Sequence, residues 1–150
     1  MKICVISGSR ADWGGLRWPV KMMRADPFFE VSEKEVWNDS VDVALREMGL
    51  YLNADRPDVM MILGDRFEIL AAAIAAHLLR VPIAHIGGGD VTKGSYDDAM
   101  RDCISRLASV HFVTSGAARD RLHALGYDNV HLVGSPGSDY ILHGHWRNGR

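Results

Sequence analysis

Apolar residues recur along the chain in short continuous runs, separated by longer stretches whose apolar positions follow helical spacing. The runs show little alternation between apolar and polar positions, as is typical of parallel strands covered on both faces. Five such strands are predicted, at Lys2–Ser7, Asp58–Leu63, Val81–Ile86, Val110–Thr114 and Val130–Val133.

The stretches between these runs predict helices over Trp13–Ala25, Ser40–Ala54, Phe67–Leu79, Tyr96–Ala108 and Gly116–Leu125. Phe67–Leu79 is apolar almost all round, so we expect a buried helix. Gly126 is the expected residue just beyond the last helix. The segment Phe28–Asn38 fits either an edge strand or a loop. Strands that alternate with helices predict an α/β fold with a doubly wound, mostly parallel, Rossmann-like sheet, in one domain over residues 1–150.

Composition and charge narrow the function classes. The 150 residues are 47% hydrophobic and 24% charged, which is typical of a globular domain that needs no disulfide or metal. A formal net charge of −2 gives no broad attraction to nucleic acid or membrane surfaces, and no run is long enough for a membrane span or a signal sequence. Cys4 and Cys103 lie in apolar stretches and are expected to be buried, reduced thiols, which favours a cytoplasmic protein.

Glycines and polar residues gather directly after the predicted strands. These segments are Gly8–Gly15, Gly64–Arg66, Gly87–Asp98, Thr114–Gly116 and Gly134–Gly137. The carboxyl ends of parallel strands meet at one edge of the sheet, where ligands of such folds bind. Glycine permits close backbone approach, and the helices that follow offer N–H groups to an anion. Turn chemistry explains any one loop, but five loops on one edge favour an anion-binding site.

Three side chains in these loops have both a structural and a functional interpretation. Arg10 and Arg66 can each clamp a phosphate with a planar pair of donors, or can lie solvated in a loop. Asp65 can cap the helix that follows it, or can act as an acid/base carboxylate.

Two further features favour structural roles. Ser95 and Asp98 have the spacing of a capping box, which makes at least one of Asp97 and Asp98 structural. His85 ends the third predicted strand, where a lone histidine is expected to be a hydrogen-bonded packing residue.

Several motifs are absent. The sequence contains no GxGxxG, P-loop lysine, GxSxG or CxxC motif, so hydride transfer, P-loop phosphoryl transfer and elbow-type ester hydrolysis lose support. His143 and His145 have no carboxylate or thiolate nearby and form only a weak metal site, so no metal and no other cofactor is predicted.

Several of the loops resemble motifs of the hydrolysing UDP-N-acetylglucosamine 2-epimerases, especially the sialic-acid-pathway branch. Gly8–Gly14 (GSRADWG) is similar to the family's GTRADYG, and Pro57–Glu68 (PDVMMILGDRFE) is similar to PDLVLVLGDRFE. The segment from His85 to Arg101 resembles HI(H/E)GGDVTxG…DDSIRH, and the similarity continues at His111-Phe112 and Val133–Gly137.

The resemblance implies half of a two-domain glycosyltransferase-B fold with its active site between the halves. The implied reaction removes the C2 proton of UDP-GlcNAc and expels UDP, and water then adds to the 2-acetamidoglucal to give N-acetylmannosamine. Such chemistry needs carboxylates at the sugar and cations at the diphosphate. The implied acid/base residues are Asp65 and one of Asp97 or Asp98. The implied substrate-binding residues are Arg10 (at the diphosphate), Arg66, His85, Gly88, Gly89, Asp90, Ser135 and Gly137.

The sequence also departs from the family pattern. Gly87 stands where the family has a glutamate or histidine that takes part in proton transfer, and Asp102 replaces the histidine after the motif arginine. The stretch before Pro57 is much shorter than in the family, which implies that the loop with the TGxH motif and a βα unit are missing. No counterpart of the family's C-terminal nucleotide-binding domain follows.

Three hypotheses result. The first is an epimerase-like enzyme that acts on UDP-GlcNAc or a related nucleotide sugar, as a homo-oligomer or with a complementary chain. The second is a non-catalytic module that binds a nucleotide sugar or sugar phosphate. The third is a structural relic of the family. The first is preferred, and no nucleic-acid or membrane partner is expected.

Overall fold

The computed structural model describes residues 1–37 and 40–142 of the chain. These residues contain one six-stranded sheet with the strand order β2-β1-β3-β4-β5-β6, in which every neighbouring pair of strands is parallel. The strands are β1 (Lys2–Ser7), β2 (Glu30–Glu35), β3 (Val59–Leu63), β4 (Ile83–Ile86), β5 (Val110–Val113) and β6 (Val130–Leu132). The five predicted strands are confirmed, and the uncertain segment after the first helix supplies β2 at the edge of the sheet.

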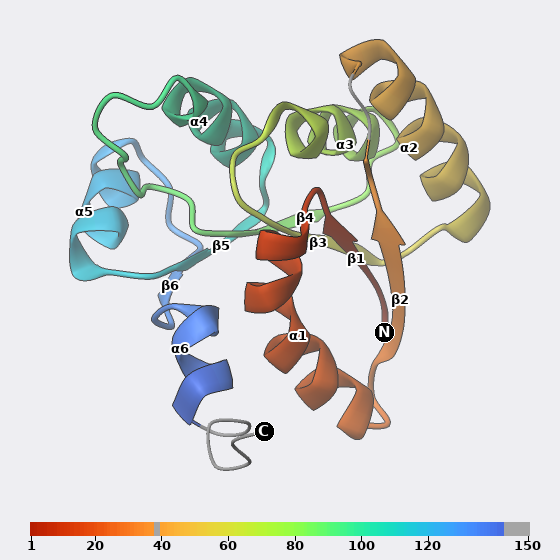
Figure 1. The fold of residues 1–150 in the computed structure, drawn as a ribbon, viewed down its shortest axis with the longest axis horizontal. Helices are drawn as coiled ribbons and strands as arrows, with labels where there is room; N and C mark the ends of the chain where they lie inside the picture. Colours follow the sequence, from red (N-terminus) through yellow and green to blue (C-terminus); the bar gives the residue numbers. More distant parts are fainter. Residues whose placement is uncertain (38–39, 143–150) are drawn as a thin grey trace.

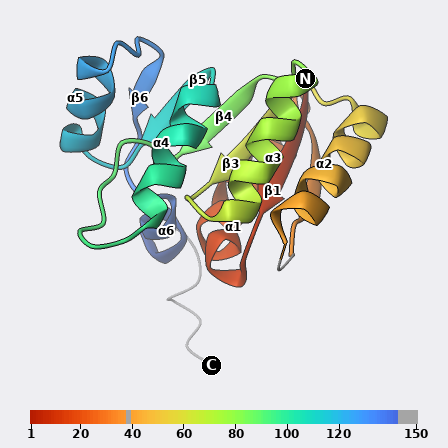
Figure 2. The same cartoon turned by 90° about the horizontal axis from the view of Figure 1, so that it is seen from above.

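Helices lie on both faces of this sheet, so the predicted doubly wound α/β fold is confirmed. They are α1 (Arg10–Ala25), α2 (Val41–Asp55), α3 (Phe67–Leu78), α4 (Asp97–Leu107), α5 (Gly116–Ala124) and α6 (Pro136–Tyr140). Figure 1 shows α2, α3 and α4 over one face and α1 and α6 on the other, and Figure 2 shows the first three in front of the strands. Within the described ranges, no helix combines the length and apolar character needed to cross a bilayer.

Each face of the sheet has its own apolar core. Met48 and Leu52 of α2 and the alanines of α3 pack with Ile62 on one face, and Leu16 and Val20 of α1 pack with Val5 on the other. The fully buried alanines confirm that α3, apolar almost all round, is a core helix.

The two cysteines differ in exposure. Cys4 is fully buried in β1, as predicted, but the prediction for Cys103 is wrong because this residue is exposed on α4. Helix α4 buries the face that carries Arg101, Ile104 and Ser105, and residue 103 therefore points away from the sheet.

Helix α1 begins at Arg10, three residues before the predicted start. Ser9 caps it, because its Oγ accepts the N–H of Asp12 at 3.2 Å, while the Asp12 carboxylate accepts the N–H of Gly8 at 3.0 Å. The first bond satisfies an N–H group that a helix start leaves unpaired, and the second holds the turn that precedes the helix. The predictions overlooked this cap and also the short helix α6.

The order of the strands determines where a ligand can bind. From the centre of the sheet the chain moves outward from β1 to β2 in one direction, and from β3 through β6 in the other. The loops that follow β1 and β3 therefore diverge and leave a crevice at the carboxyl edge of the sheet.

A tight turn of three glycines follows β4 and fixes this edge. A Cβ atom on Gly88 would lie 2.9 Å from Ser105 Oγ, and one on Gly89 would lie 2.6 Å from the carbonyl oxygen of Ala118. Gly89 also has a φ of +77°, which L-residues with side chains rarely adopt. The turn thus packs directly against α4 and α5 and sets the position of Asp90.

We predict that Gly89→Ala lowers the free energy of unfolding by about 2–4 kcal/mol, because the methyl group meets backbone at a positive φ. Gly49→Ala is the matched control, since Gly49 lies inside α2 with nothing within 4 Å of an added Cβ. This control should raise the stability by about 0.5–1 kcal/mol through helix propensity. Urea unfolding measures both, and equal stabilities of the two variants would contradict the packing described.

Candidate functional site

A cavity of about 320 Å³ lies at the carboxyl edge of the sheet. Its walls come from the segments that follow β1, β3, β4, β5 and β6, so it forms where the strand order predicts a ligand crevice. The charged residues in its lining are Asp65, Asp90 and Arg101, and the polar ones include Thr114 and Ser135. The cavity thus combines two carboxylates with one guanidinium.

Arg101 of α4 connects the loops around this cavity. It is only 7% exposed, and its guanidinium forms ion pairs with Asp65 and Asp98. Its Nη1 also donates to the main-chain carbonyl of Asp90 at 2.7 Å, and its Nη2 lies 3.5 Å from the Thr92 hydroxyl. Arginine is suited to this role because its five donors form a planar fork.

The sequence interpretation left Arg101 out of the site, although a signal was present. Arg101 follows Asp98 by three residues, and it precedes the buried Ile104 and Ser105 by three and four residues on the same helix. An arginine on the buried face of a helix requires acidic partners, so the spacing alone marks it as part of a charge network.

Asp65 follows β3 and points toward Arg101. The structural alternative, in which Asp65 caps α3, is wrong, because the cap position is Arg66 and no side chain accepts a hydrogen bond there. The Asp65 carboxylate instead pairs with the Arg101 guanidinium and lines the cavity.

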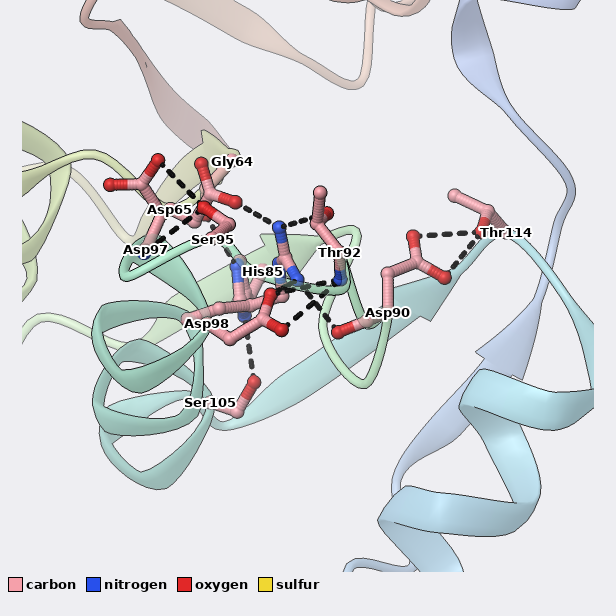
Figure 3. Close-up of polar contacts among 11 residues, drawn as sticks. Gly64, Asp65, His85, Asp90, Thr92, Ser95, Asp97, Asp98, Ser105 and Thr114 are labelled. Atoms are coloured by element: carbon pink, nitrogen blue, oxygen red, sulfur yellow. Dashed lines mark hydrogen bonds and ion pairs between the residues drawn. The ribbon is translucent and has the colours of Figure 1, made fainter.

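Asp97 and Asp98 begin α4, but the predicted capping box is not formed. The Asp98 carboxylate accepts the N–H of Thr92 at 3.1 Å and pairs with Arg101, while the hydroxyl of Ser95 contacts Asp97 at 3.2 Å (Figure 3). The cap position of α4 is Tyr96, which makes no side-chain cap. The Asp98 carboxylate therefore accepts from the main chain of Thr92 and not from that of Ser95, and Ser95 Oγ accepts the N–H of Asp97 at 3.2 Å.

His85 is fully buried at the end of β4, in register with Ile62 of β3 and His111 of β5. Its Nε2 lies 3.0 Å from the carbonyl oxygen of Gly64 and its Nδ1 lies 3.2 Å from Ser105 Oγ (Figure 3). A carbonyl only accepts, so Nε2 carries the proton and Nδ1 accepts from the serine hydroxyl. This confirms His85 as a hydrogen-bonded packing residue, and it fixes the peptide that precedes Asp65.

Burial lowers the pKa of His85 to about 4, and the nearby His111 and Arg101 add to the effect. The neutral ring therefore persists at neutral pH. In the unfolded chain the same side chain has a pKa of about 6.5. Between these values the unfolded state binds a proton that the folded state does not, so the stability is fully present above about pH 6.5 and is lost as the pH falls toward 4.

We predict that this histidine contributes on the order of 3 kcal/mol to the loss of stability between pH 6.5 and pH 4. His85→Gln keeps a donor and an acceptor but does not titrate, so its free energy of unfolding should fall less over the same range. Urea unfolding at a series of pH values measures the two slopes. Parallel curves for wild type and variant would show that His85 is not the group responsible.

The two predicted phosphate clamps lie outside the cavity lining. Arg10 is exposed in the first turn of α1, and no ion pair with it is found in the part of the chain that the structure describes. Arg66 is half-exposed and pairs with Glu68, a buried carboxylate that the sequence interpretation missed. The Arg66 guanidinium is thus partly occupied, whereas that of Arg10 is available.

The predicted site residues divide by position. Asp65, Asp90, Ser135 and Gly137 line the cavity. His85, Gly88 and Gly89 are buried behind it, and Asp98 reaches it through Arg101. Arg10, Arg66 and Asp97 are not part of the lining. His143 and His145 lie outside the described residues, and the ranges that are described contain no group of three or more His, Cys, Asp or Glu placed to hold a metal.

We predict that Arg101→Ala lowers the free energy of unfolding by about 3–5 kcal/mol, because it leaves the Asp65 and Asp98 carboxylates partly buried without their cation. Arg46→Ala, on the exposed face of α2, should change it by less than about 0.5 kcal/mol. Urea unfolding at pH 7 compares the two. Equal losses would mean that the Arg101 network contributes no more than an ordinary surface arginine.

The sequence is similar to those of known proteins. Residues 21–148 match the family model described as UDP-N-acetylglucosamine 2-epimerase. The UDP-N,N′-diacetylbacillosamine 2-epimerase (hydrolyzing) of Legionella pneumophila is 43% identical over 91 residues, which cover 59% of this chain and 24% of that protein. The GDP/UDP-N,N′-diacetylbacillosamine 2-epimerase (hydrolyzing) of Campylobacter jejuni is 30% identical, with 93% of this chain and 46% of that protein covered.

The fold also matches solved structures. The UDP-GlcNAc 2-epimerase from Neisseria meningitidis, bound to UDP-GlcNAc, superimposes with a TM-score of 0.89 at 17% sequence identity, over 95% of this chain and 48% of that one. Where most of this chain is matched, it therefore spans about half the length of the relative.

Proposed function

The chain belongs to the UDP-N-acetylglucosamine 2-epimerase family, and from this premise we propose that it takes part in the hydrolysing epimerisation of a UDP-linked 2-acetamido sugar. In that reaction a carboxylate takes the proton from C2, the C–H electron pair forms the C1=C2 double bond, and UDP leaves with the electrons of the C1–O bond. Water then adds across the double bond, with its hydroxyl at C1 and a proton at C2. From UDP-GlcNAc the products are UDP and N-acetylmannosamine.

One observation carries the proposal: motifs far apart in the sequence converge on a single cavity. The GDR segment after β3, the GGGD segment after β4 and the SPG segment after β6 all contribute to its lining. Carboxylates that face a sugar ring can serve as acid and base, and a fixed guanidinium can stabilise the charge that develops beside them.

The size of the cavity indicates which part of the ligand it holds. A volume of about 320 Å³ is at the lower end of the roughly 300–1,000 Å³ that ligand pockets provide. It suits a 2-acetamido sugar ring rather than a whole nucleotide sugar. The diphosphate and uridine would extend outward, where the exposed Arg10 at the start of α1 is available to pair with phosphate oxygens.

The relatives support a substrate class rather than one sugar. Two of them are named for UDP-N,N′-diacetylbacillosamine, and the family description names UDP-N-acetylglucosamine. Both sugars carry an acetamido group at C2 beside the bond to UDP, so the same chemistry applies to either.

The proposed enzyme needs a second surface. The chain covers 46% of the Campylobacter jejuni relative and 48% of the Neisseria meningitidis structure, and its cavity is open toward solvent at the edge of the sheet. We propose that another copy of this chain or a complementary chain covers the nucleotide, as the second Rossmann-like half does in the glycosyltransferase-B arrangement.

We expect the purified protein to release UDP from UDP-GlcNAc or from UDP-N,N′-diacetylbacillosamine, because both present the same reacting atoms to the cavity. Asp65→Asn should lower the rate by about 10²-fold or more, since it removes a carboxylate from the cavity and breaks its ion pair. Asp128→Asn, which changes an exposed aspartate after α5, is the matched control and should leave the rate unchanged. A coupled assay for UDP and NMR of the sugar product measure turnover. A wild-type rate no higher than that of Asp65→Asn, with both sugars, would refute turnover by this chain alone or as a homo-oligomer.

A second candidate function is a non-catalytic module that binds nucleotide sugars. It is favoured by Gly87, which brings no side chain to the cavity, and by Asp65, whose carboxylate is already paired with Arg101. This alternative gives saturable binding of UDP-GlcNAc in an NMR titration without release of UDP.

A further inference from the structure

The two carboxylates that line the cavity are in different electrostatic situations. Asp65 shares an ion pair with Arg101, so any proton that it accepts must break that pair. Asp90 forms no ion pair within the described ranges, and its carboxylate accepts only from the hydroxyl of Thr114, which lies 2.9 Å from each oxygen. A single hydroxyl donates one hydrogen, so the other lone pairs of Asp90 remain available.

Asp90 is also close to the space that Gly87 leaves open. A Cβ atom on Gly87 would lie 3.9 Å from Asp90 Oδ2, and both residues line the cavity. The Asp90 carboxylate therefore lies beside the place that a side chain at residue 87 would occupy on the cavity wall.

The main chain around Asp90 is held firmly. Arg101 Nη1 donates to the Asp90 carbonyl at 2.7 Å, and Arg121 donates to the carbonyl of Gly89. The glycine turn packs against α5 at Gly89, and Thr114 orients the carboxylate from the end of β5 (Figure 3). A proton acceptor that is fixed in this way is positioned before the substrate arrives.

We propose that Asp90 is the general base that removes the C2 proton, in place of a side chain at residue 87. The proposal rests on the proposed function. One Asp90 oxygen takes the proton, the C–H electron pair becomes the C1=C2 double bond, and the pair of the C1–O bond leaves with UDP. Asp65, held by Arg101, keeps its negative charge and accepts hydrogen bonds from a sugar hydroxyl or from the water that adds later.

Asp90→Asn tests this assignment, because it keeps the size of the side chain and removes its ability to accept the proton. We expect kcat for UDP release to fall by about 10²–10⁴-fold with KM little changed, and deuterium incorporation at C2 in D₂O to fall in parallel. Asp90→Glu keeps the carboxylate and should recover part of the rate. Calorimetry with UDP-GlcNAc confirms that Asp90→Asn still binds the substrate.

Thr114→Val separates catalysis from a structural role. It breaks the same Asp90–Thr114 hydrogen bond but leaves the carboxylate in place, so kcat should fall by less than about tenfold. Equal losses in Thr114→Val and Asp90→Asn would show that Asp90 only anchors its loop, and a wild-type rate in Asp90→Asn would also overturn the assignment.

If the wild-type protein releases no UDP, the proposed function fails and the assignment of Asp90 fails with it. If wild type turns over and Asp90→Asn releases UDP at the wild-type rate, only the assignment is wrong.

Discussion

A guanidinium keeps its charge at any physiological pH, so an arginine that is 7% exposed must be surrounded by acceptors. Arg101 meets this constraint by contacting acceptors from three segments. These acceptors are the Asp65 carboxylate after β3, the Asp90 carbonyl in the turn after β4, and the Asp98 carboxylate in its own helix. These segments form the wall of the cavity. The positions of Asp65, Asp98 and the Asp90 carbonyl follow from the need to satisfy this one buried charge.

The same constraint makes the carboxylates chemically unequal. Asp65 and Asp98 compensate the charge of Arg101, whereas Asp90 contributes only its main-chain carbonyl to that network and leaves its carboxylate to the cavity. Behind them the neutral ring of His85 bonds the Gly64 carbonyl and Ser105, so the strand ends cannot move independently. A site built this way presents fixed donors and acceptors at the carboxyl edge of the sheet.

Much of the fold could be predicted because it depends on local patterns. Continuous apolar runs and helical spacing are properties of neighbouring residues, and the five predicted strands and helices are all present. The errors arose where other groups take the carboxylate of a predicted cap, or where a local cap was overlooked. Ser95 and Asp98 have the spacing of a cap, yet Arg101 and the N–H of Thr92 take the Asp98 carboxylate, while the overlooked Ser9 caps α1 together with Asp12.

The α/β class, the edge of the sheet at which the loops converge and the family to which the motifs belong could all be predicted, because each depends on short segments of consecutive residues. The side chains that face the cavity could be identified only from the packed fold. Arg101 was absent from the predicted site and lines it, whereas Arg66 was predicted there and is turned toward Glu68. Which side chains line the cavity depends on how strands and helices far apart in the chain pack together. A local sequence pattern does not contain this information.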